Sequence, residues 1–433
     1  MVDFPTDNHG WSELLSPRLV VDSIQGVHRV PWVIVGGGLT GLSCARRLAE
    51  LYPNDEVLLL DARLIGQGAS GRNSGFAVGV SHFPGPYKIQ DKENIDRVNR
   101  INQAGLALLD QQITSQSIHC QWDNNGFHHG AADTMSIKEH GHFVNYLDAI
   151  EAEHNSLNED DMKSRFGTSL YKAGVHVKTG ALVQPAALVR GLANNIPSNV
   201  RLIENCPVLK IKSGRTIKIT TSSGEITTDK LVLATNYEAP KIGFLKRRVL
   251  GSTLSGSFTR ILTPQELATL GSHESWGIIS LHSGGATLRL TSDGRISLRN
   301  TAEYNGGALL SPQTLKRRQI THRNSFEKRF PQLAEVPFEF AWSGVEGISR
   351  NDTNFFGQQS KNIFLAGGYN GSGVSRGTAF GYALAEYAGG GQSELITDCL
   401  RSKAASWLPP RPFLDLGAML KVKARFQGAG LDR

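Results

Sequence analysis

A glycine-rich turn at residues 36–41, with the sequence GGGLTG, constrains the fold of this chain more than any other segment. The apolar, β-branched run at 30–35 precedes it and predicts a buried parallel strand. Residues 42–51 then place leucine and alanine at helical spacing, and a second apolar run ends in Asp61, 20 residues after Gly41. This order of strand, turn, helix and acidic strand end predicts the first βαβ unit of a Rossmann-type, dinucleotide-binding domain.

Each part of this unit has a physical task. Gly36 permits the tight turn, Gly38 lets a pyrophosphate approach the backbone, and Gly41 lets the helix pack on the strand. The N-terminus of the helix then faces the phosphates with its partial positive charge. An acid at position 61, rather than an arginine, accepts hydrogen bonds from the adenosine ribose and disfavours the 2′-phosphate of NADP. We therefore predict dinucleotide contacts from Gly36, Gly38, Leu39, Thr40, Gly41, Asp61, Ala62 and Arg63.

Composition excludes several other classes of protein. The 433 residues are 39% hydrophobic, which is too apolar for a disordered tail, yet no run of about 18 apolar residues would span a bilayer. The 4 cysteines are scattered, so we predict neither a disulfide framework nor a metal site. The acidic N-terminal segment lacks the apolar core of a secretory signal, which predicts a cytoplasmic protein. Of the 47 glycines, 18 fall in residues 36–79 and 367–391, where the backbone must approach something closely.

The positive charge is unevenly distributed. Residues 241–331 hold 14 basic and 5 acidic side chains, whereas the whole chain carries a formal charge of +7. Such a segment suits an anionic small substrate, an anionic surface or simply solvent. The basic residues at 316–318, 323 and 328–329 predict an exposed helical face. Aromatic residues do not alternate with the basic ones as they do on base-stacking surfaces, so we predict no nucleic-acid partner.

A second glycine-rich loop distinguishes FAD from NAD. Residues 66–76, GQGASGRNSGF, resemble the second phosphate-and-flavin loop of the D-amino acid oxidase and glycine oxidase superfamily of FAD-dependent amine oxidoreductases, in particular its branch similar to gamma-glutamylputrescine oxidase. In that family the loop follows the pyrophosphate and ribityl chain to the isoalloxazine ring. The resemblance implies an FAD cofactor, with contacts from Gly68, Ala69, Ser70, Arg72, Asn73, Ser74 and Gly75.

Two later segments carry the same resemblance, which covers about residues 30–410. The strand at 230–236 ends in Ala-Thr-Asn, similar to the Ala-Thr-Gly turn where flavoprotein chains return to the cofactor domain. Residues 362–377 form a strand, a glycine turn and the start of a helix, which in the family points its N-terminus at the flavin and favours its anionic reduced form. The implied contacts are Val208, Ala234, Thr235, Gly367, Gly368, Asn370, Gly371, Ser372, Gly373, Val374 and Ser375.

The resemblance implies an α/β fold in two parts, a Rossmann-type FAD-binding domain of the glutathione-reductase kind and an antiparallel-sheet substrate domain. Residues 91–165 look largely helical, whereas 241–345 alternate like antiparallel strands. We expect the active site between the two parts. The expected FAD-binding segments are 27–90, 166–240 and 346–400, the substrate-binding segments are 91–165 and 241–345, and the tail is 401–433. This tail is either a docked segment or an amphipathic helix that touches a membrane.

The catalytic residues are less sharply defined by the sequence. The resemblance implies oxidation of an amine with no obligatory strong base, because the protein mainly orients the substrate against the flavin. Arg299 falls near the place where sarcosine-oxidase-like members keep a lysine that promotes reaction with oxygen, with an unrelated surface arginine as the alternative. Further pocket candidates, for each of which packing is an equal alternative, are His82, Tyr304, Trp342, Arg350 and Tyr369.

Departures from the family bear on the cofactor linkage and the substrate. No cysteine lies between Trp342 and Gly357, where some members attach the flavin, so we expect non-covalent FAD. Ser375 stands where oxidases of N-methylated amino acids keep a carboxylate-binding lysine, which disfavours sarcosine. Arg376 follows it but is expected to point elsewhere, and Arg350 is the other candidate for a carboxylate.

Three functions stay open at this point. The first is an oxidase that converts a primary or secondary amine, or an amino acid, to an imine and passes the electrons to O2, giving H2O2. Its basic segment suits a substrate with an anionic group. The second is a dehydrogenase that passes electrons to a quinone or another acceptor, and the third is a flavin-binding subunit without turnover. The oligomeric state is not predicted.

Overall fold

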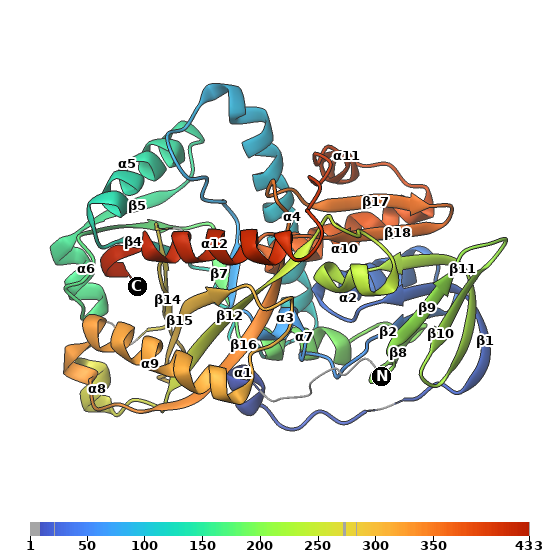
Figure 1. Cartoon of the computed structure of the whole chain (residues 1–433), viewed down its shortest axis with the longest axis horizontal. Coiled ribbons are helices and arrows are strands. Elements are labelled where there is room, and N and C mark those ends of the chain that lie inside the picture. Colours follow the sequence, from blue (N-terminus) through green and yellow to red (C-terminus); the bar gives the residue numbers. More distant parts are fainter. Residues whose placement is uncertain (1–8, 21, 272–273, 283, 433) are drawn as a thin grey trace.

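The computed structural model describes residues 9–20, 22–271, 274–282 and 284–432. The described strands form two eight-stranded sheets and one two-stranded sheet, and the two large sheets divide the molecule into two halves (Figure 1). We call the half with the sheet around residues 26–35 the cofactor half, and the half with the sheet around residues 250–259 the substrate half. The predicted α/β fold, with a Rossmann-type part and a largely antiparallel part, is confirmed.

The sheet of the cofactor half is mainly parallel. Strand β1 pairs in parallel with β2 and with β11, so the βαβ unit predicted from the glycine turn is present. Successive residues of β1 alternate between two cores: Ile34 packs with helices α2 and α10, and Val33 packs on the side of β10. The strand order is β17 (Phe355–Ser360), β18 (Ile363–Gly367), β11 (Gly224–Leu233), β1 (Gly26–Val35), β2 (Val57–Leu60) and β8 (Val200–Ile203), with β9 (Val208–Lys212) and β10 (Ile217–Thr221) attached through β11.

Helices cover one face of this sheet. They are α2 (Leu39–Leu51), α10 (Gly373–Gly389), α4 (Lys92–Ser115), α7 (Pro185–Asn194) and α11 (Glu394–Leu400). Helices α10 and α4 cross closely at Gly105, where a Cβ atom would lie 1.9 Å from the carbonyl oxygen of Ser375. This glycine therefore sets how near α4 comes to the first turn of α10.

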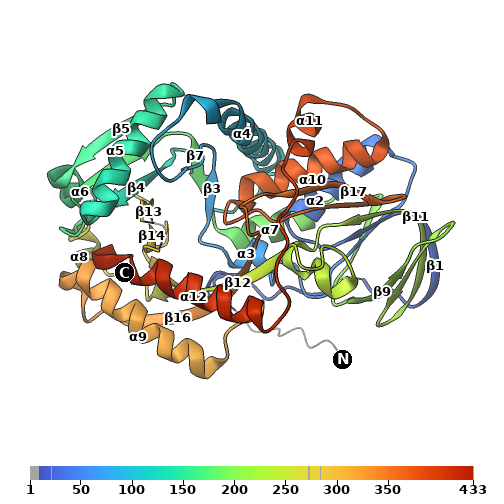
Figure 2. The same cartoon turned by 45° about the horizontal axis from the view of Figure 1, so that its top comes forward.

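The sheet of the substrate half is antiparallel except where β13 runs parallel to β4. One face is covered by α9 (Pro312–Arg329), whose Phe326 packs in a fully buried core beneath the strands. Its order is β16 (Phe338–Ile348), β12 (Leu250–Thr259), β15 (Ile296–Glu303), β14 (Thr287–Leu290), β13 (Trp276–Ser280), β4 (Phe127–Ala131), β6 (Ala173–Val177) and β5 (His154–Asn158). The short sheet of β3 (Phe76–Val78) and β7 (Gly180–Leu182) lies between the halves (Figure 2).

The expectation that residues 91–165 are largely helical is confirmed, but the segment also holds two strands that the sequence did not reveal. Besides α4, α5 (Thr134–Ala149) and α6 (Glu159–Phe166), this segment contributes β4 and β5 to the substrate-half sheet. Strand β4 carries two histidines and is held by pairing with β13 and β6, which no local pattern reveals. Strand β6 pairs in the same sheet beyond the expected boundary at residue 166, and the division into domains stays a prediction.

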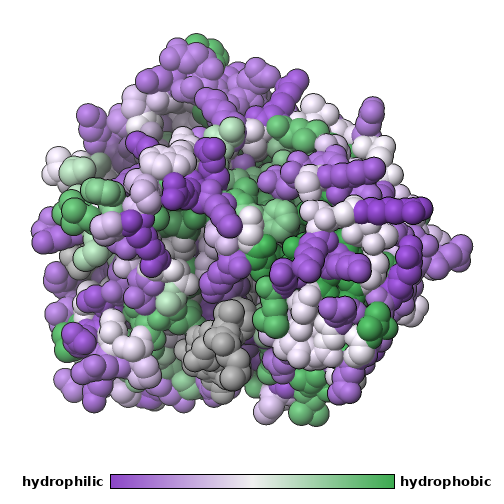
Figure 3. All heavy atoms as spheres, turned by 45° about the vertical axis from the view of Figure 1, so that its right-hand side comes forward, coloured by the Kyte–Doolittle hydropathy of each residue, from purple (hydrophilic) through white to green (hydrophobic). Residues whose placement is uncertain are grey.

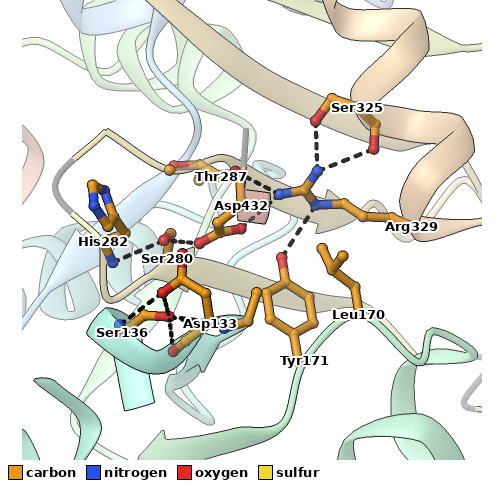
Figure 4. Close-up of polar contacts among 12 residues, drawn as sticks. Asp133, Ser136, Leu170, Tyr171, Ser280, His282, Thr287, Ser325, Arg329 and Asp432 are labelled. Atoms are coloured by element: carbon orange, nitrogen blue, oxygen red, sulfur yellow. Dashed lines mark hydrogen bonds and ion pairs between the residues drawn. The ribbon is translucent and has the colours of Figure 1, made fainter. Parts of the chain in front are cut away.

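The C-terminal tail crosses from one half to the other as α12 (Phe413–Gln427), which lies beside β15 (Figures 1 and 2). Its end is fixed in the substrate half, where Asp432 pairs with Arg329 at 2.6 Å and both side chains are fully buried (Figure 4). The prediction of an exposed basic face therefore fails at Arg329, because this residue turns inward to meet a carboxylate 103 positions away. The tail is a docked segment.

Hydrophilic and hydrophobic side chains are mixed on the face of the molecule shown in Figure 3. The face shown in Figure 3 is mostly hydrophilic, with hydrophobic areas dispersed among charged side chains. Within the described residues, no helix is both long enough and apolar enough to cross a membrane.

Candidate active site

One large cavity, of about 1430 Å³, lies between the two halves and is lined from both of them. The elements of the cofactor half that line it are the glycine turn, the loop at 66–74 and the first turn of α10. From the substrate half it receives β12, β15 and β16, together with the inner side of α12. All predicted catalytic candidates line it, namely His82, Arg299, Tyr304, Trp342, Arg350 and Tyr369.

Most predicted cofactor residues also line the cavity, but Gly41, Gly75, Gly367, Gly368 and Ser375 do not. They lie behind the wall and shape it. Gly41 packs on the turn, and Gly75 takes a positive φ of 78° where a Cβ atom would lie 2.2 Å from the carbonyl oxygen of Val183. The roles of the predicted contact residues stay predictions.

The glycine turn forms a cradle that larger residues would fill. Gly36 has a φ of +106°, and a Cβ atom there would lie 2.6 Å from the carbonyl oxygen of Ala234. A Cβ atom on Gly41 would lie 1.8 Å from the carbonyl oxygen of Gly36, and one on Gly38 would lie 2.7 Å from Ser70 Oγ. Backbone therefore stays open to a ligand at the start of α2, as a pyrophosphate requires.

Asp61 directly follows β2 and lies beside the glycine turn. Its two carboxylate oxygens accept hydrogen bonds from the backbone N–H of Gly37, at 2.7 Å, and of Arg63, at 2.8 Å. Burial raises the pKa of Asp61 to about 6, although both hydrogen bonds and the Arg63 guanidinium oppose that shift. Arg63 itself lines the cavity and pairs with Glu238 at 2.9 Å.

The second glycine loop is fastened to the substrate half by Arg72, which is buried in α3 (Ala69–Arg72). Its guanidinium donates to the carbonyl oxygen of Gln67 at 2.8 Å and to that of Ser343 on β16 at 2.9 Å. Trp342 donates back to the carbonyl oxygen of Arg72 at 3.1 Å. Trp11, in the N-terminal helix α1 (Gly10–Glu13), donates to the carbonyl oxygen of Asn73 at 2.7 Å. Sequence reasoning missed this N-terminal contact.

Tyr369, in the turn before α10, and Arg376, in the first turn of α10, both line the cavity. The Tyr369 hydroxyl forms a 2.7 Å hydrogen bond with Thr40 Oγ1 in the glycine turn, so the side chain connects two cofactor segments. Arg376 lines the cavity, whereas we expected it to point elsewhere, and it donates to Asn102 Oδ1 and Ser81 Oγ, both at 3.1 Å. Burial, then the nearby Arg97, lowers the pKa of Arg376 to about 10.

The remaining catalytic candidates differ in what holds them. Arg299 donates to Thr287 Oγ1, and Tyr304 donates to Asp415 Oδ1 on α12 at 2.8 Å. Arg350 is exposed at the cavity edge and reaches the carbonyl oxygen of Trp407 at 3.5 Å. His82 forms a 2.8 Å hydrogen bond with Glu139 Oε1.

Several cavity residues carried no sequence signal. Glu139 and His129 lie in a segment that was expected on the substrate side, but neither was singled out as a site residue, and α12 adds Leu414, Ala418 and Lys421 to the cavity wall. The apolar spacing of the tail was visible in the sequence, but nothing local showed what it would face.

The Rossmann-type turn, the second glycine loop and a cavity shared by two sheets define a flavin-dependent oxidoreductase fold. The chain belongs to the DAO family of FAD-dependent oxidoreductases, whose model matches residues 31–387. A gamma-glutamylputrescine oxidoreductase from Escherichia coli (strain K12) is 26% identical over 92% of this chain and 90% of its own. A probable oxidoreductase, OrdL, from Rhizobium meliloti (strain 1021) is 27% identical over 89% of this chain and 90% of its own.

Among solved structures, glycine oxidase from Geobacillus kaustophilus superimposes with a TM-score of 0.72 at 17% identity, over 85% of this chain and 96% of that one. The family resemblance inferred from the glycine loops is confirmed, and the cofactor is FAD. The cradle fits it, because the glycine turn leaves backbone open beside Asp61 within one long cavity. The four cysteines are all buried and none lines the cavity, and non-covalent attachment of FAD stays a prediction.

Proposed function

We propose that the protein oxidises the C–N bond of a small primary or secondary amine, or of an amino acid, to an imine that water hydrolyses to an aldehyde or keto acid. The observation that carries this proposal is the shared cavity, which brings the predicted FAD contacts and ionisable side chains such as His82 and Arg299 into one space. Bound FAD supplies the two-electron acceptor, and the chain orients the substrate against it.

We further propose O2 as the electron acceptor, with H2O2 as product. The test is anaerobic mixing of the FAD-loaded protein with a panel that includes γ-glutamylputrescine, glycine and simple alkylamines. The expected result is loss of the oxidised-flavin absorption, followed on aeration by its return with one H2O2 per turnover. If no amine or amino acid of the panel bleaches the flavin, the proposed activity fails for that panel and the non-catalytic alternative gains support.

A second candidate function is a dehydrogenase that passes electrons to a quinone. One observation favours it: α12 presents an exposed apolar row, with Leu416, Met419 and Leu420 each more than half exposed. Such a face suits a lipid surface where quinones dissolve. Bleaching by an amine, with reoxidation by a soluble quinone but without H2O2, would decide for this alternative.

We propose that the substrate carries an anionic group. Arg299 on β15 and Lys421 on α12 both line the cavity, where they would attract such a group. Glu139 and Glu346 line it from the same half, so the proposal rests on these two cations and not on the charge of the whole cavity. A matched pair of amines, 4-aminobutanoate and butylamine, differs mainly in the carboxylate. Since a hydrogen bond to a charged group contributes about 1.5–3 kcal/mol, we expect kcat/KM to favour the carboxylate by about tenfold or more. Equal values for the pair would contradict the proposal.

A further inference from the structure

A histidine and a glutamate meet on the cavity wall away from the glycine cradle. His82 lies in the loop after β3, and Glu139 lies on α5 in the substrate half. His82 Nε2 is 2.8 Å from Glu139 Oε1, and both residues line the cavity. Glu139 is itself fixed, because the backbone N–H of Gly85 donates to both of its oxygens, at 2.9 and 3.1 Å.

This pairing determines which nitrogen of His82 is available. Glu139 is held in its ionised form, because hydrogen bonds from Gly85 and His82 outweigh burial and lower the pKa of Glu139. An ionised carboxylate accepts a proton, so Nε2 of His82 carries the hydrogen and donates. None of the described residues donates a hydrogen bond to Nδ1 of His82, so the Nδ1 lone pair is available to a ligand.

The surroundings keep His82 uncharged at neutral pH. Its ring packs edge-on against Phe143 at 4.8 Å between centroids, and the ring of His129 lies 6.1 Å away. Burial lowers the pKa of His82 below its usual 6.5, and the Glu139 charge opposes this only in part. His129 is also neutral, because burial lowers the pKa of this residue to about 3.

We infer that His82 is the proton acceptor for the substrate's ammonium group and that Glu139 positions its ring. This inference rests on the proposed amine oxidation. An amine in water near neutral pH is mostly protonated, and an ammonium has no lone pair with which to form a C=N bond. A neutral imidazole, oriented by a carboxylate and open to the same cavity as the FAD contacts, removes that obstacle.

The ammonium proton and the hydrogen on the α-carbon leave the substrate for different acceptors. One ammonium N–H bond breaks, and its proton goes to Nδ1 of His82, which becomes an imidazolium paired with Glu139. The lone pair left on nitrogen forms the C=N bond while the α-carbon loses its hydrogen as hydride, and the two electrons reach the bound FAD as oxidant. The imidazolium then returns its proton to water between turnovers.

Other ionisable groups lie beside this pair, and His282 lines the cavity as well. From α5, His142 Nδ1 lies 3.4 Å from Glu139 Oε2, and from β4, His129 faces the His82 ring. Arg376 bonds the neighbouring Ser81 from α10. Within the described chain, no group of three His, Cys, Asp or Glu side chains is arranged to hold a metal ion, and this includes the side chains around His82 and Glu139.

The first test is the pH profile of kcat/KM for His82→Asn and wild type, with the fastest amine of the panel as substrate. Wild type should lose activity as pH falls through the His82 pKa, below 6.5. The variant should be about 100-fold slower at pH 7, and the deficit should shrink as pH approaches the amine's own pKa, where free amine replaces the missing base. A variant profile parallel to wild type would overturn the inference. FAD content reports whether the variant folds.

Glu139→Gln tests whether Glu139 positions His82, through the direction in which the pKa of His82 moves. The Glu139 charge raises the pKa of His82, so its removal should move the acidic limb of the profile to lower pH and cost roughly tenfold in kcat/KM. A purely structural role would lower activity without moving the limb. His119→Asn is the matched control, because His119 is exposed and does not line the cavity, and this variant should leave the profile unchanged.

A readout without substrate separates this inference from the proposed function. Among the imidazole NMR signals of the 13 histidines, the one missing in His82→Asn should titrate below 6.5 in wild type and lower still in Glu139→Gln. An unchanged or raised value in Glu139→Gln would contradict the pairing. If the amine panel fails while this titration behaves as expected, the proposed function falls and the His82–Glu139 pairing stands; if the panel succeeds and the titration does not, the role given to His82 falls alone.

Discussion

The two halves of the molecule build their parts of the cavity with different contacts. In the cofactor half the decisive contacts are close approaches of backbone to backbone, such as Gly41 to the carbonyl oxygen of Gly36 and Gly105 to that of Ser375. In the substrate half they are between side chains far apart in sequence, such as Arg329 with Asp432, 103 positions away. The glycine contacts require a residue without a side chain, whereas the side-chain contacts require a particular partner residue.

The two kinds of contact should respond differently to mutation. Every other amino acid has a Cβ atom, which would collide with backbone at Gly36 and Gly41, so the glycine turn should tolerate almost no replacement. A charged pair can instead be lost in two ways, because removal of one partner leaves a buried charge, whereas removal of both leaves an apolar gap. The substrate half should therefore respond non-additively to paired changes, and the cofactor half should not.

The largest expected effect is the loss of one partner of the buried pair. Arg329→Met leaves Asp432 fully buried without its cation, and this should lower the free energy of unfolding by about 3–5 kcal/mol in a urea titration. The double variant Arg329→Met with Asp432→Leu should lose less than the sum of the single changes. Arg317→Met on the exposed side of the same helix is the control, with a change within about 0.5 kcal/mol. Additive single changes would show that no coupled pair exists.

The next effect belongs to the cofactor half. Gly41→Ala puts a Cβ atom 1.8 Å from the carbonyl oxygen of Gly36, so the helix and the turn must separate. Overpacking of about 1–3 kcal/mol would weaken FAD binding by about 5- to 150-fold, measured by fluorescence titration of the apoprotein. Gly141→Ala, in α5 with open space around its Cβ position, should bind FAD like wild type. Equal affinities for the two variants would contradict the close approach.

The same difference explains what the sequence could predict. The glycine turn, Asp61 and the return to β18 are local patterns, so the βαβ unit, the FAD cofactor and the family followed from them. Strand β4 was missed because its burial comes from β13 and β6 rather than from its own pattern. Glu139 was missed for a related reason, since its partner His82 lies 57 positions away in a loop.

Arg329 shows the limit most clearly. Its place in a basic helical run predicted exposure, and only the docked C-terminal segment turns it into a buried residue. The charge pattern of a helix predicts which residues are exposed only while the helix is considered alone. A basic residue can be buried once another segment supplies the opposite charge. Single-sequence reasoning therefore predicts backbone motifs well and long-range side-chain pairs poorly.

A smaller effect should appear in the pH dependence of FAD binding. Burial raises the pKa of Asp61 to about 6, so the carboxylate prevails above that pH and is protonated below it. Because a charged acceptor binds a hydroxyl more strongly than a neutral acid by about 1 kcal/mol, FAD affinity should fall about fivefold as pH drops through 6. Asp61→Asn should bind FAD weakly with no such step. A step retained in this variant would assign the titration to another group.

The smallest effect tests whether α12 contributes to the substrate side or only covers it. Tyr304→Phe removes the hydroxyl that donates to Asp415 Oδ1 at 2.8 Å, and with it one link between the end of β15 and α12. A half-buried hydrogen bond contributes about 1 kcal/mol, so KM for the amine should rise about fivefold, while kcat and FAD affinity stay unchanged. Tyr87→Phe, at a half-buried tyrosine that does not line the cavity, is the control and should leave KM unaltered. A fall in kcat in place of a rise in KM would put Tyr304 in contact with the reacting atoms, and the long-range contacts of the substrate half would then serve the chemistry as well as the shape of the cavity.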